Sequence, residues 1–365
     1  MKQSAHTLKK PKKYLILSSK GWGTGCALRA FYIAEALRRK GHRVNFPSPI
    51  PSLPGWIDMG LSTFYYFLYS LFVWSDVAFC VKPYPMAVPA LWVQRLKGAR
   101  VVFDVDDVDY AYSHGLFMKF HRWLQKPWPN WADLVTYHNP LLKEHLTKDF
   151  LVPSTKIRRL PQGVDETIFN TLPLNSLDLP PGVEYWKGKA KGPVLCFTAH
   201  LNVACDLGPA LEAFRILLQL SPSARLLVAG GGPDEDKFMD QARELGINDS
   251  VYFTGYLSPQ EVAACLKLSD AVLVYYSDNP ANRHRSSMKL RESLACGLKV
   301  VATKVGEAAS WKKGLFLSPA DPESFAKTIR EALKAKKPPQ QGALLVKKWG
   351  WQNCVTALEE DIPGS

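Results

Sequence analysis

Cysteine pairs with a regular spacing are missing from this sequence of 365 residues. Its seven cysteines are scattered, mostly inside apolar runs, and none shows C-x-x-C or zinc-site spacing. This pattern argues against a disulfide framework and a structural metal. We expect small core residues in a reducing environment, which indicates a cytoplasmic location.

Apolar runs that could span a bilayer are also scarce. The basic N-terminus is followed only by the short apolar segment Tyr14–Leu17, so we expect no secretory signal. The aromatic segment Trp56–Trp74 has Asp58 as its only charge, but it is marginal against the about 20 residues that a span needs. We predict a buried or half-buried helix there; an interfacial helix, which the flanking tryptophans favour, and a true span are the alternatives.

Acidic residues are few in the first part of the chain. Up to about residue 160 there are about 23 Lys and Arg against about 10 Asp and Glu, whereas the remainder is near balance. This asymmetry indicates a negatively charged partner: phosphates, an anionic membrane surface or nucleic acid. No RNA-binding signature accompanies the short basic run at the N-terminus, so we expect no nucleic acid.

Common nucleophile and phosphate motifs are absent too. There is no G-x-S-x-G and no evident Ser/His/Asp set. Gly21, Gly23 and Gly25 lie between an expected strand and helix, but their spacing fits neither G-x-G-x-x-G nor the Walker pattern. This loop either approaches an anion closely or forms a tight turn.

What the chain does contain is a strand–helix alternation that occurs twice. Short apolar runs alternate with helical stretches, as in parallel sheets with crossover helices. We predict two doubly wound α/β domains with ligands at the carboxyl ends of their strands. The expected parts are an N-terminal domain at 1–172, a Pro-, Gly- and Lys-rich linker at 173–192, a C-terminal domain at 193–343, and a final helical segment at 344–365 that crosses back to the N-terminal domain.

Residues 282–297, NRHRSSMKLRESLACG, concentrate basic side chains around one carboxylate. Ser286, Ser287 and Met288 are predicted to form the first turn of a helix whose amides could hold a diphosphate. Lys289 would neutralise that diphosphate, and Glu292 would lie on the same side of the helix. An ordinary amphipathic helix with solvated charges is the alternative.

Two glycine-containing strand ends are harder to assign. ARLLVAGGGPDED is explained by a strand-to-helix turn followed by acidic residues at the helix start. In VYFTGYLSPQEV, Gly255 and Tyr256 lie at a strand end where a planar base could rest, or they form a simple turn.

Asp104, Asp106, Asp107 and Asp109 are the one concentration of acidity in the basic half. They could order an acceptor hydroxyl or act as a base. They could also bind a metal, or cap a helix and pair with nearby cations. His114 and His138 are further candidates, although a single histidine is commonly structural.

The order of the motifs in the second half resembles the nucleotide-sugar domain of glycosyltransferase family 4. The matching segments are AGGGP, VYFTGYL, SDAVLVYY, KLRESLACGLKVVAT and VGE. In the first half, ALRRKGHRV, ADLVTYHNP and KIRRLPQGVDETIF agree with the same family. The resemblance implies the GT-B fold, with two Rossmann-like doubly wound parallel-sheet domains facing a central cleft.

The resemblance also implies an activity. A sugar would move from a UDP- or GDP-sugar to an acceptor hydroxyl with retention of configuration, without a metal or any cofactor besides the donor. The basic first domain would take a lipid-linked or cell-envelope glycan, which suggests a cytoplasmic protein peripheral to the inner membrane face. A catalytically inactive nucleotide- or glycan-binding partner protein and a sugar-nucleotide epimerase are the alternatives.

By position, the resemblance implies that Glu292 binds the ribose, Tyr256 contacts the base, and the amides from Ser286 to Lys289 hold the diphosphate. The sequence departs from the family at three places. His284 replaces the first of two glutamates; Ala199-His200 and Cys205 replace a Gly-Arg and a Lys; Asp106 replaces a histidine. Cationic neighbours, Arg283, Arg285 and Lys289, could substitute for the missing clamp.

The resulting predictions form three groups. The predicted catalytic residues are His284, Lys289 and Asp106. The predicted acceptor-side residues are Asp107 and His114. The predicted donor-binding residues are Glu292, Ser286, Ser287, Met288, Arg285, His200, Tyr256, Gly23, Thr24 and Gly25.

Overall fold

The computed structural model describes residues 10–19, 21, 24–48, 55–82, 84–112, 115–170, 178–188, 191–311, 313–336 and 348–362. The chain divides into two compact units. Unit 1 comprises Met1–Asp106, Gly115–Leu160 and Trp351–Ser365, and unit 2 comprises Asp107–His114 and Pro161–Gly350.

Unit 1 contains a six-stranded parallel sheet of order β2-β1-β3-β4-β5-β6. Its central strands are buried apolar runs, as expected where helices cover both faces. The strands are β1 (Lys13–Ser18), β2 (Arg43–Asn45), β3 (Val77–Val81), β4 (Arg100–Val105), β5 (Leu134–Tyr137) and β6 (Ile157–Arg159).

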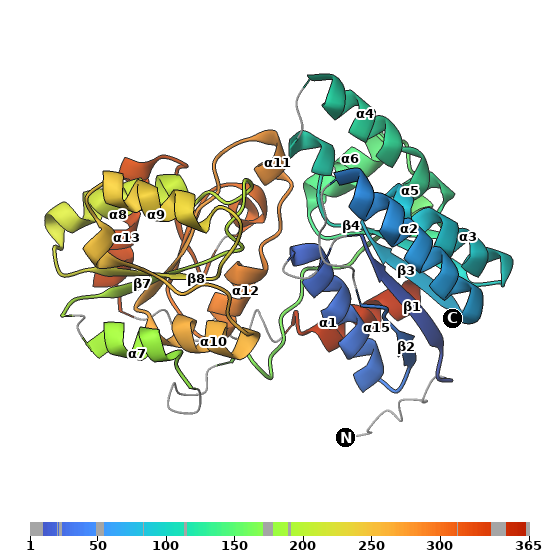
Figure 1. The fold of residues 1–365 in the computed structure, drawn as a ribbon, viewed down its shortest axis with the longest axis horizontal. Helices are drawn as coiled ribbons and strands as arrows, with labels where there is room; N and C mark the ends of the chain where they lie inside the picture. Colours follow the sequence, from blue (N-terminus) through green and yellow to red (C-terminus); the bar gives the residue numbers. More distant parts are fainter. Residues whose placement is uncertain are drawn as a thin grey trace. The chain divides into compact units, whose positions relative to one another are not determined.

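The helices of unit 1 lie on both faces of this sheet (Figure 1). One face carries α1 (Gly25–Arg39) together with α15 (Trp351–Asp361), which pack against each other. The other carries α2 (Gly55–Phe72), α3 (Val88–Leu96), α4 (Gly115–Gln125), α5 (Pro127–Trp131) and α6 (Pro140–Lys148), with the short 3-10 turns η1 (Pro85–Ala87) and η3 (Ser154–Lys156) in the connections.

Unit 2 repeats the pattern with sheet order β12-β11-β10-β7-β8-β9. Its strands are β7 (Val194–Thr198), β8 (Arg225–Ala229), β9 (Val251–Phe253), β10 (Ala271–Val274), β11 (Val300–Thr303) and β12 (Phe316–Ser318). Its helices are α7 (Pro181–Gly188), α8 (Leu207–Leu220), α9 (Glu235–Glu244), α10 (Pro259–Leu268), α11 (Pro280–Arg283), α12 (Met288–Ala295) and α13 (Pro322–Lys334), and its 3-10 turns are η2 (Asp109–Tyr112), η5 (Asn248–Ser250) and η6 (Gly306–Ser310).

Alternation along β7 shows how unit 2 builds two cores. Leu195 and Phe197 pack into one buried cluster with α8 and α13, whereas Cys196 packs into the other with α10 and α12. The strand order reverses between β7 and β10, and ligands of doubly wound sheets bind at such a reversal. The predicted pair of doubly wound parallel sheets is therefore confirmed.

The internal boundaries differ from the predicted ones. The chain passes from unit 1 to unit 2 after Leu160, twelve residues before the predicted end at 172. Residues 181–188 of the predicted linker form α7, which buries Val183 in the core of unit 2. The final helix begins at Trp351 and belongs to unit 1.

Two expectations about cysteines and membranes can be compared with the structure. All seven cysteines are free thiols, and only Cys205 is not fully buried. Helix α2 contains most of the segment 56–74. Across the described parts of the chain, no helix is both long and apolar enough to cross a bilayer.

Candidate functional site

The residues at the carboxyl edge of unit 2 converge on the ring of Tyr276, which follows β10. The Lys289 Nζ lies 5.4 Å from this ring centroid and the Arg285 guanidinium 5.1 Å from it. The Tyr276 hydroxyl lies 3.1 Å from the Ser287 Oγ. The structure therefore brings together the predicted catalytic Lys289 and two predicted donor-binding residues, Arg285 and Ser287, through a tyrosine that the sequence analysis did not single out.

Helix α12 starts later than predicted. Ser287 is its N-cap, accepting a hydrogen bond from the Leu290 amide at 3.4 Å, and the helix begins at Met288. The prediction that Ser286 and Ser287 lie in the first helical turn is wrong, because Ser286 precedes the cap and its hydroxyl donates to Glu307.

A buried ion pair beneath this helix start was missed by the sequence analysis. The Arg291 Nη1 lies 2.7 Å from the Glu307 Oε2, and the guanidinium also lies 4.9 Å from the ring centroid of Trp349. Both partners are buried, so either charge alone would be costly. The pair ties α12 to the loop after β11. Because its members are sixteen residues apart, helical spacing gives no signal for it.

The loop before α12 is fixed by Asp206, the N-cap residue of α8. The two Asp206 oxygens accept hydrogen bonds from the Ser277 hydroxyl at 2.8 Å and the Asn282 amide at 2.9 Å. Asn279 caps the short α11 by accepting from the Asn282 N–H at 2.8 Å. The basic loop is thus held in place by buried and half-buried polar contacts.

Lys289 and Glu292 lie one turn apart on α12, with Lys289 directed toward β7. The Lys289 Nζ lies 4.8 Å from the Phe197 ring centroid, and no described carboxylate forms an ion pair with it. Desolvation raises the pKa of the half-buried Glu292 to about 7, against the opposing effect of the Lys289 charge. A cation without a carboxylate partner beside an easily protonated acid suits a polyanionic, hydroxyl-bearing ligand.

His200 and Tyr256 come from two other strand ends and meet at this edge. Their ring centroids are 6.1 Å apart. Gly230, Gly231 and Gly232 allow this approach, since a Cβ on Gly230 would lie 2.0 Å from the Ala199 carbonyl oxygen. Close backbone packing therefore explains the three glycines. Through this packing they help to place Tyr256, the residue predicted to contact the base.

Two basic residues of the stretch make contacts within their own loop. The His284 Nδ1 lies 2.7 Å from the Pro280 carbonyl oxygen. The Arg283 Nε pairs with Asp278 at 2.6 Å on the exposed surface. The Arg285 Nη1 donates to the Ala204 carbonyl at 3.0 Å, which anchors that side chain between two loops.

In unit 1, the acidic cluster separates into structural and candidate functional residues. Asp104 is buried and accepts from Arg29 at 2.6 and 2.9 Å and from the Thr136 hydroxyl at 2.5 Å, so its role is structural. Asp106 lies 3.7 Å from the Lys82 Nζ, and the His138 ring contacts the Asp106 carbonyl oxygen. Lys82, which the sequence analysis missed, has a positive φ of 68°, an uncommon conformation for a non-glycine residue.

The remaining predicted residues are dispersed. The Asp107 Oδ1 accepts from the Val108 amide at 2.9 Å, and Asp107 groups with unit 2. Thr24 caps α1 by accepting from the Ala27 amide at 3.3 Å, and Gly25 begins that helix. Gly23 and His114 lie outside the described residues.

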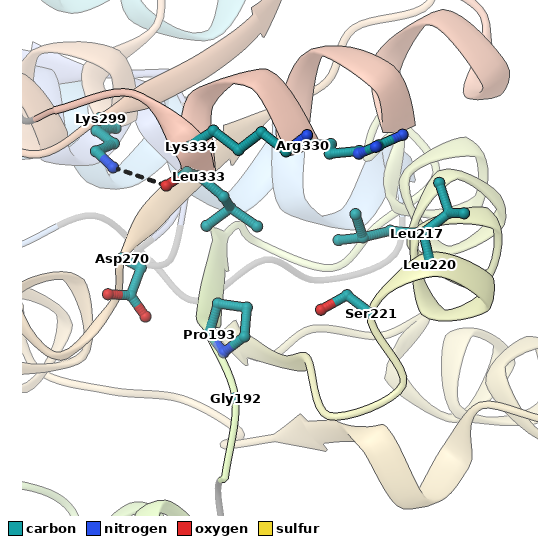
Figure 2. A pocket seen from close by; sticks show the side chains of 10 residues that line it. All are labelled: Gly192, Pro193, Leu217, Leu220, Ser221, Asp270, Lys299, Arg330, Leu333 and Lys334. Carbon is teal, nitrogen blue, oxygen red and sulfur yellow. Dashed lines mark hydrogen bonds between the residues drawn. The ribbon is translucent and has the colours of Figure 1, made fainter.

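A cavity of about 510 Å³ lies at the opposite, amino edge of the unit 2 sheet (Figure 2). Its charged side chains are those of Asp270, Lys299, Arg330 and Lys334, and none of the predicted site residues lines it. No cluster of three metal-ligating side chains occurs within the described ranges.

With this geometry in place, comparison with known proteins identifies the second half of the chain. Residues 186–343 match the model of the family "Glycosyl transferases group 1". They form a domain of that family.

Curated relatives show the same similarity over longer or shorter segments. The chain is 35% identical over 104 residues to alpha-monoglucosyldiacylglycerol synthase of Streptococcus pneumoniae, covering 28% of this chain and 22% of that one. The match to GDP-mannose-dependent alpha-(1-6)-phosphatidylinositol monomannoside mannosyltransferase of Mycolicibacterium smegmatis has 23% identity, with 77% and 74% coverage. The chain spans less than half the length of several curated relatives that it matches.

Solved structures extend the likeness to the whole chain. Anabaena Alr3699/HepE in complex with UDP and glucose has a TM-score of 0.72 at 16% identity, covering 96% of this chain and 98% of that one. The predicted GT-B fold is thereby confirmed.

Proposed function

We propose that the protein transfers a glycosyl group from a nucleoside-diphosphate sugar to an acceptor hydroxyl, with retention of anomeric configuration. The observation that supports this most directly is the arrangement at the start of α12. There Lys289, the capped helix terminus and Glu292 meet at the sheet reversal of a glycosyl transferases group 1 domain.

The diphosphate of the donor would lie over the free amides of Met288 and Lys289. The positive end of the helix and the Lys289 ammonium both favour an anion there. As the bond between the anomeric carbon and the β-phosphate oxygen breaks, these groups stabilise the negative charge that develops on the leaving nucleoside diphosphate. The new bond forms to the acceptor oxygen, whose proton passes to the departing phosphate.

The nucleoside would be held by groups on either side of that helix. Glu292 would accept hydrogen bonds from ribose hydroxyls, and the exposed Tyr256 ring beside His200 would stack on the base. His284 occupies the position of the family's first glutamate, and we propose that it contacts the transferred sugar. Its ring is held by the Pro280 carbonyl oxygen, 2.7 Å from Nδ1.

The acceptor would bind unit 1 at the carboxyl ends of β3, β4 and β5. Lys82, Asp106 and His138 lie together there, and Asp106 would order the attacking hydroxyl. Two relatives are named for glycosylating lipids, a diacylglycerol and a phosphatidylinositol mannoside. We therefore favour a lipid-linked or envelope glycan as acceptor, with the protein acting at the inner face of a membrane.

A transfer assay with labelled UDP- and GDP-sugars and a membrane extract tests the proposal. Lys289→Ala should reduce transfer by about 100-fold or more, because one group that stabilises developing charge is commonly worth that much. Lys327→Ala, an exposed lysine of α13, is the matched control and should retain full activity.

The substitution at His284 keeps a second function open, that of a nucleotide-binding partner protein without catalysis. A thermal-shift screen with UDP, GDP, ADP and CMP separates the two. Stabilisation by a nucleotide, without transfer or hydrolysis of any donor, would replace the first proposal by the second. Turnover of a donor in the absence of any acceptor would instead indicate an epimerase.

A further inference from the structure

Helix α4 carries its apolar side chains on the side that faces solvent. Leu116, Phe117, Phe120 and Trp123 are 81%, 73%, 53% and 69% exposed, whereas Gln125 is 5% exposed. At about 100° per residue the four apolar residues fall in one arc, and Gln125 lies outside it on the protein side. A helix of a soluble domain normally has the reverse arrangement. We refer to these four residues as the α4 face.

Helix α2, which lies on the same side of the unit 1 sheet (Figure 1), independently shows the same inversion of buried and exposed side chains. Its buried side contains Ser62, Tyr66 and Ser70, and the Tyr66 hydroxyl donates to the Ser18 carbonyl at 2.7 Å. Its exposed side is an apolar stripe made of Leu61, Phe64, Leu68, Leu71 and Phe72. Single exposed apolar residues are common on protein surfaces and need no explanation. Two exposed apolar arcs in one layer of helices form a larger apolar surface and do need one.

The charge next to the α4 face indicates what covers it. Lys119, Arg122 and Lys126 are exposed, and the sequence from Gly115 to Trp131 contains no Asp or Glu. Arg122 also approaches Asp149 at 3.3 Å, in an exposed pair. An apolar arc rich in Phe and Trp and edged by cations fits the interface of an anionic lipid surface.

A second copy of this chain fits less well. A symmetric contact through the α4 face would place two sets of these cations against each other, without acidic partners on the same segment. Neither helix has to cross the membrane, since binding to a membrane surface uses only the outward side of each helix.

We propose that the α4 face, with its flanking lysines and arginine, docks unit 1 on the surface of a membrane that contains anionic phospholipids. Aromatic and leucine side chains enter the headgroup region while the cations pair with lipid phosphates. This docking requires neither donor nor catalysis, so it can hold or fail separately from the proposed transfer reaction.

Vesicle flotation of the full chain without nucleotide tests the proposal. The protein should float with vesicles of phosphatidylcholine mixed with phosphatidylglycerol, much less with phosphatidylcholine alone, and less at high salt. Phe120→Ser with Trp123→Ser should reduce binding at least tenfold. Lys119→Gln with Lys126→Gln should reduce it about 25-fold, since each basic residue near an anionic surface contributes about fivefold.

Matched controls lie on unit 2. Leu220→Ser removes an equally exposed apolar side chain, and Lys327→Gln with Lys334→Gln removes two exposed lysines; both should bind vesicles as the unaltered protein does. Unchanged melting temperatures would show that the variants fold. Equal binding to both vesicle types would overturn the proposal. Normal vesicle binding by the α4 variants would also overturn it. The same holds if light scattering shows that the α4 substitutions change only the oligomeric state, from dimer to monomer.

Discussion

At the scale of single residues, Glu292 combines two conflicting requirements. In the proposed complex Glu292 accepts hydrogen bonds from ribose hydroxyls best when it is ionised, yet desolvation at this position raises its pKa to about 7. Lys289, one turn away, partly opposes that effect. A bound diphosphate would neutralise the Lys289 charge and so reduce its lowering effect on the Glu292 pKa. Hydrogen bonds from ribose hydroxyls would instead favour the ionised carboxylate.

Nucleotide affinity should therefore rise with pH up to about 7 and then level off. Below about pH 7 the carboxyl is protonated in the free protein and must lose its proton to bind ribose, so affinity should increase by up to about tenfold per pH unit. Calorimetric titration with UDP or GDP between pH 5.5 and 8 measures this, and Glu292→Gln should flatten the profile. An affinity that falls as the pH rises would contradict a ribose contact through the ionised Glu292 carboxylate.

Some residues of the site were predictable and others were not. Lys289 and Glu292 stand out in sequence because their spacing places them on one side of a helix. Tyr276, Asp206 and the Arg291–Glu307 pair act through contacts between separate loops, and no local pattern marks them. Asp106 could be singled out as an acid, but its neighbour Lys82 comes from a different strand.

At the scale of elements, hydrogen-bonded caps determine where helices begin. Ser287 caps α12 and Ser258 caps α10, the latter in a reciprocal capping box with Glu261. Only the first of these helix starts carries the proposed diphosphate. Comparing the two serines therefore distinguishes the effect of a lost cap on stability from its effect on nucleotide binding.

Ser287→Ala and Ser258→Ala should each lower the free energy of unfolding by about 1 kcal/mol. Only Ser287→Ala should also weaken nucleotide binding, because the loss of its cap loosens the amides of the first turn of α12. Denaturant titration and calorimetry on both variants provide the comparison. Equal nucleotide affinities in the two variants would show that the start of α12 does not bind the diphosphate.

The strands were predictable where they are long and apolar. The segments of β1, β4 and β8 stand out as apolar runs, whereas β12, with only FLS between loops, was not anticipated. Helix α7 was read as linker because Pro and Gly dominate its surroundings; burial of Val183 against unit 2 decides its structure instead. Helix propensity does not predict that tertiary contact.

At the scale of the whole molecule, the last helix joins the unit formed by the first part of the chain. On α15, Trp351 stacks on Tyr32 at 5.9 Å, and its ring lies 5.6 Å from the Arg29 guanidinium. At the other end of α15, the buried Glu359 lies 2.6 Å from both the Lys40 Nζ and the His42 Nε2. Unit 1 therefore cannot complete its packing without residues 351–361.

Trp351→Ala should consequently destabilise unit 1 alone. Removal of this buried indole should lower the unfolding free energy by about 3–5 kcal/mol, through lost packing and the cavity left behind. In scanning calorimetry with and without nucleotide, the transition that nucleotide raises should belong to unit 2. Trp351→Ala should lower the melting temperature of the unit 1 transition and leave that of the nucleotide-sensitive unit 2 transition unchanged. If Trp351→Ala lowered the nucleotide-sensitive transition equally, the two units would unfold as one cooperative body, and the nucleotide could not be assigned to unit 2 by this measurement.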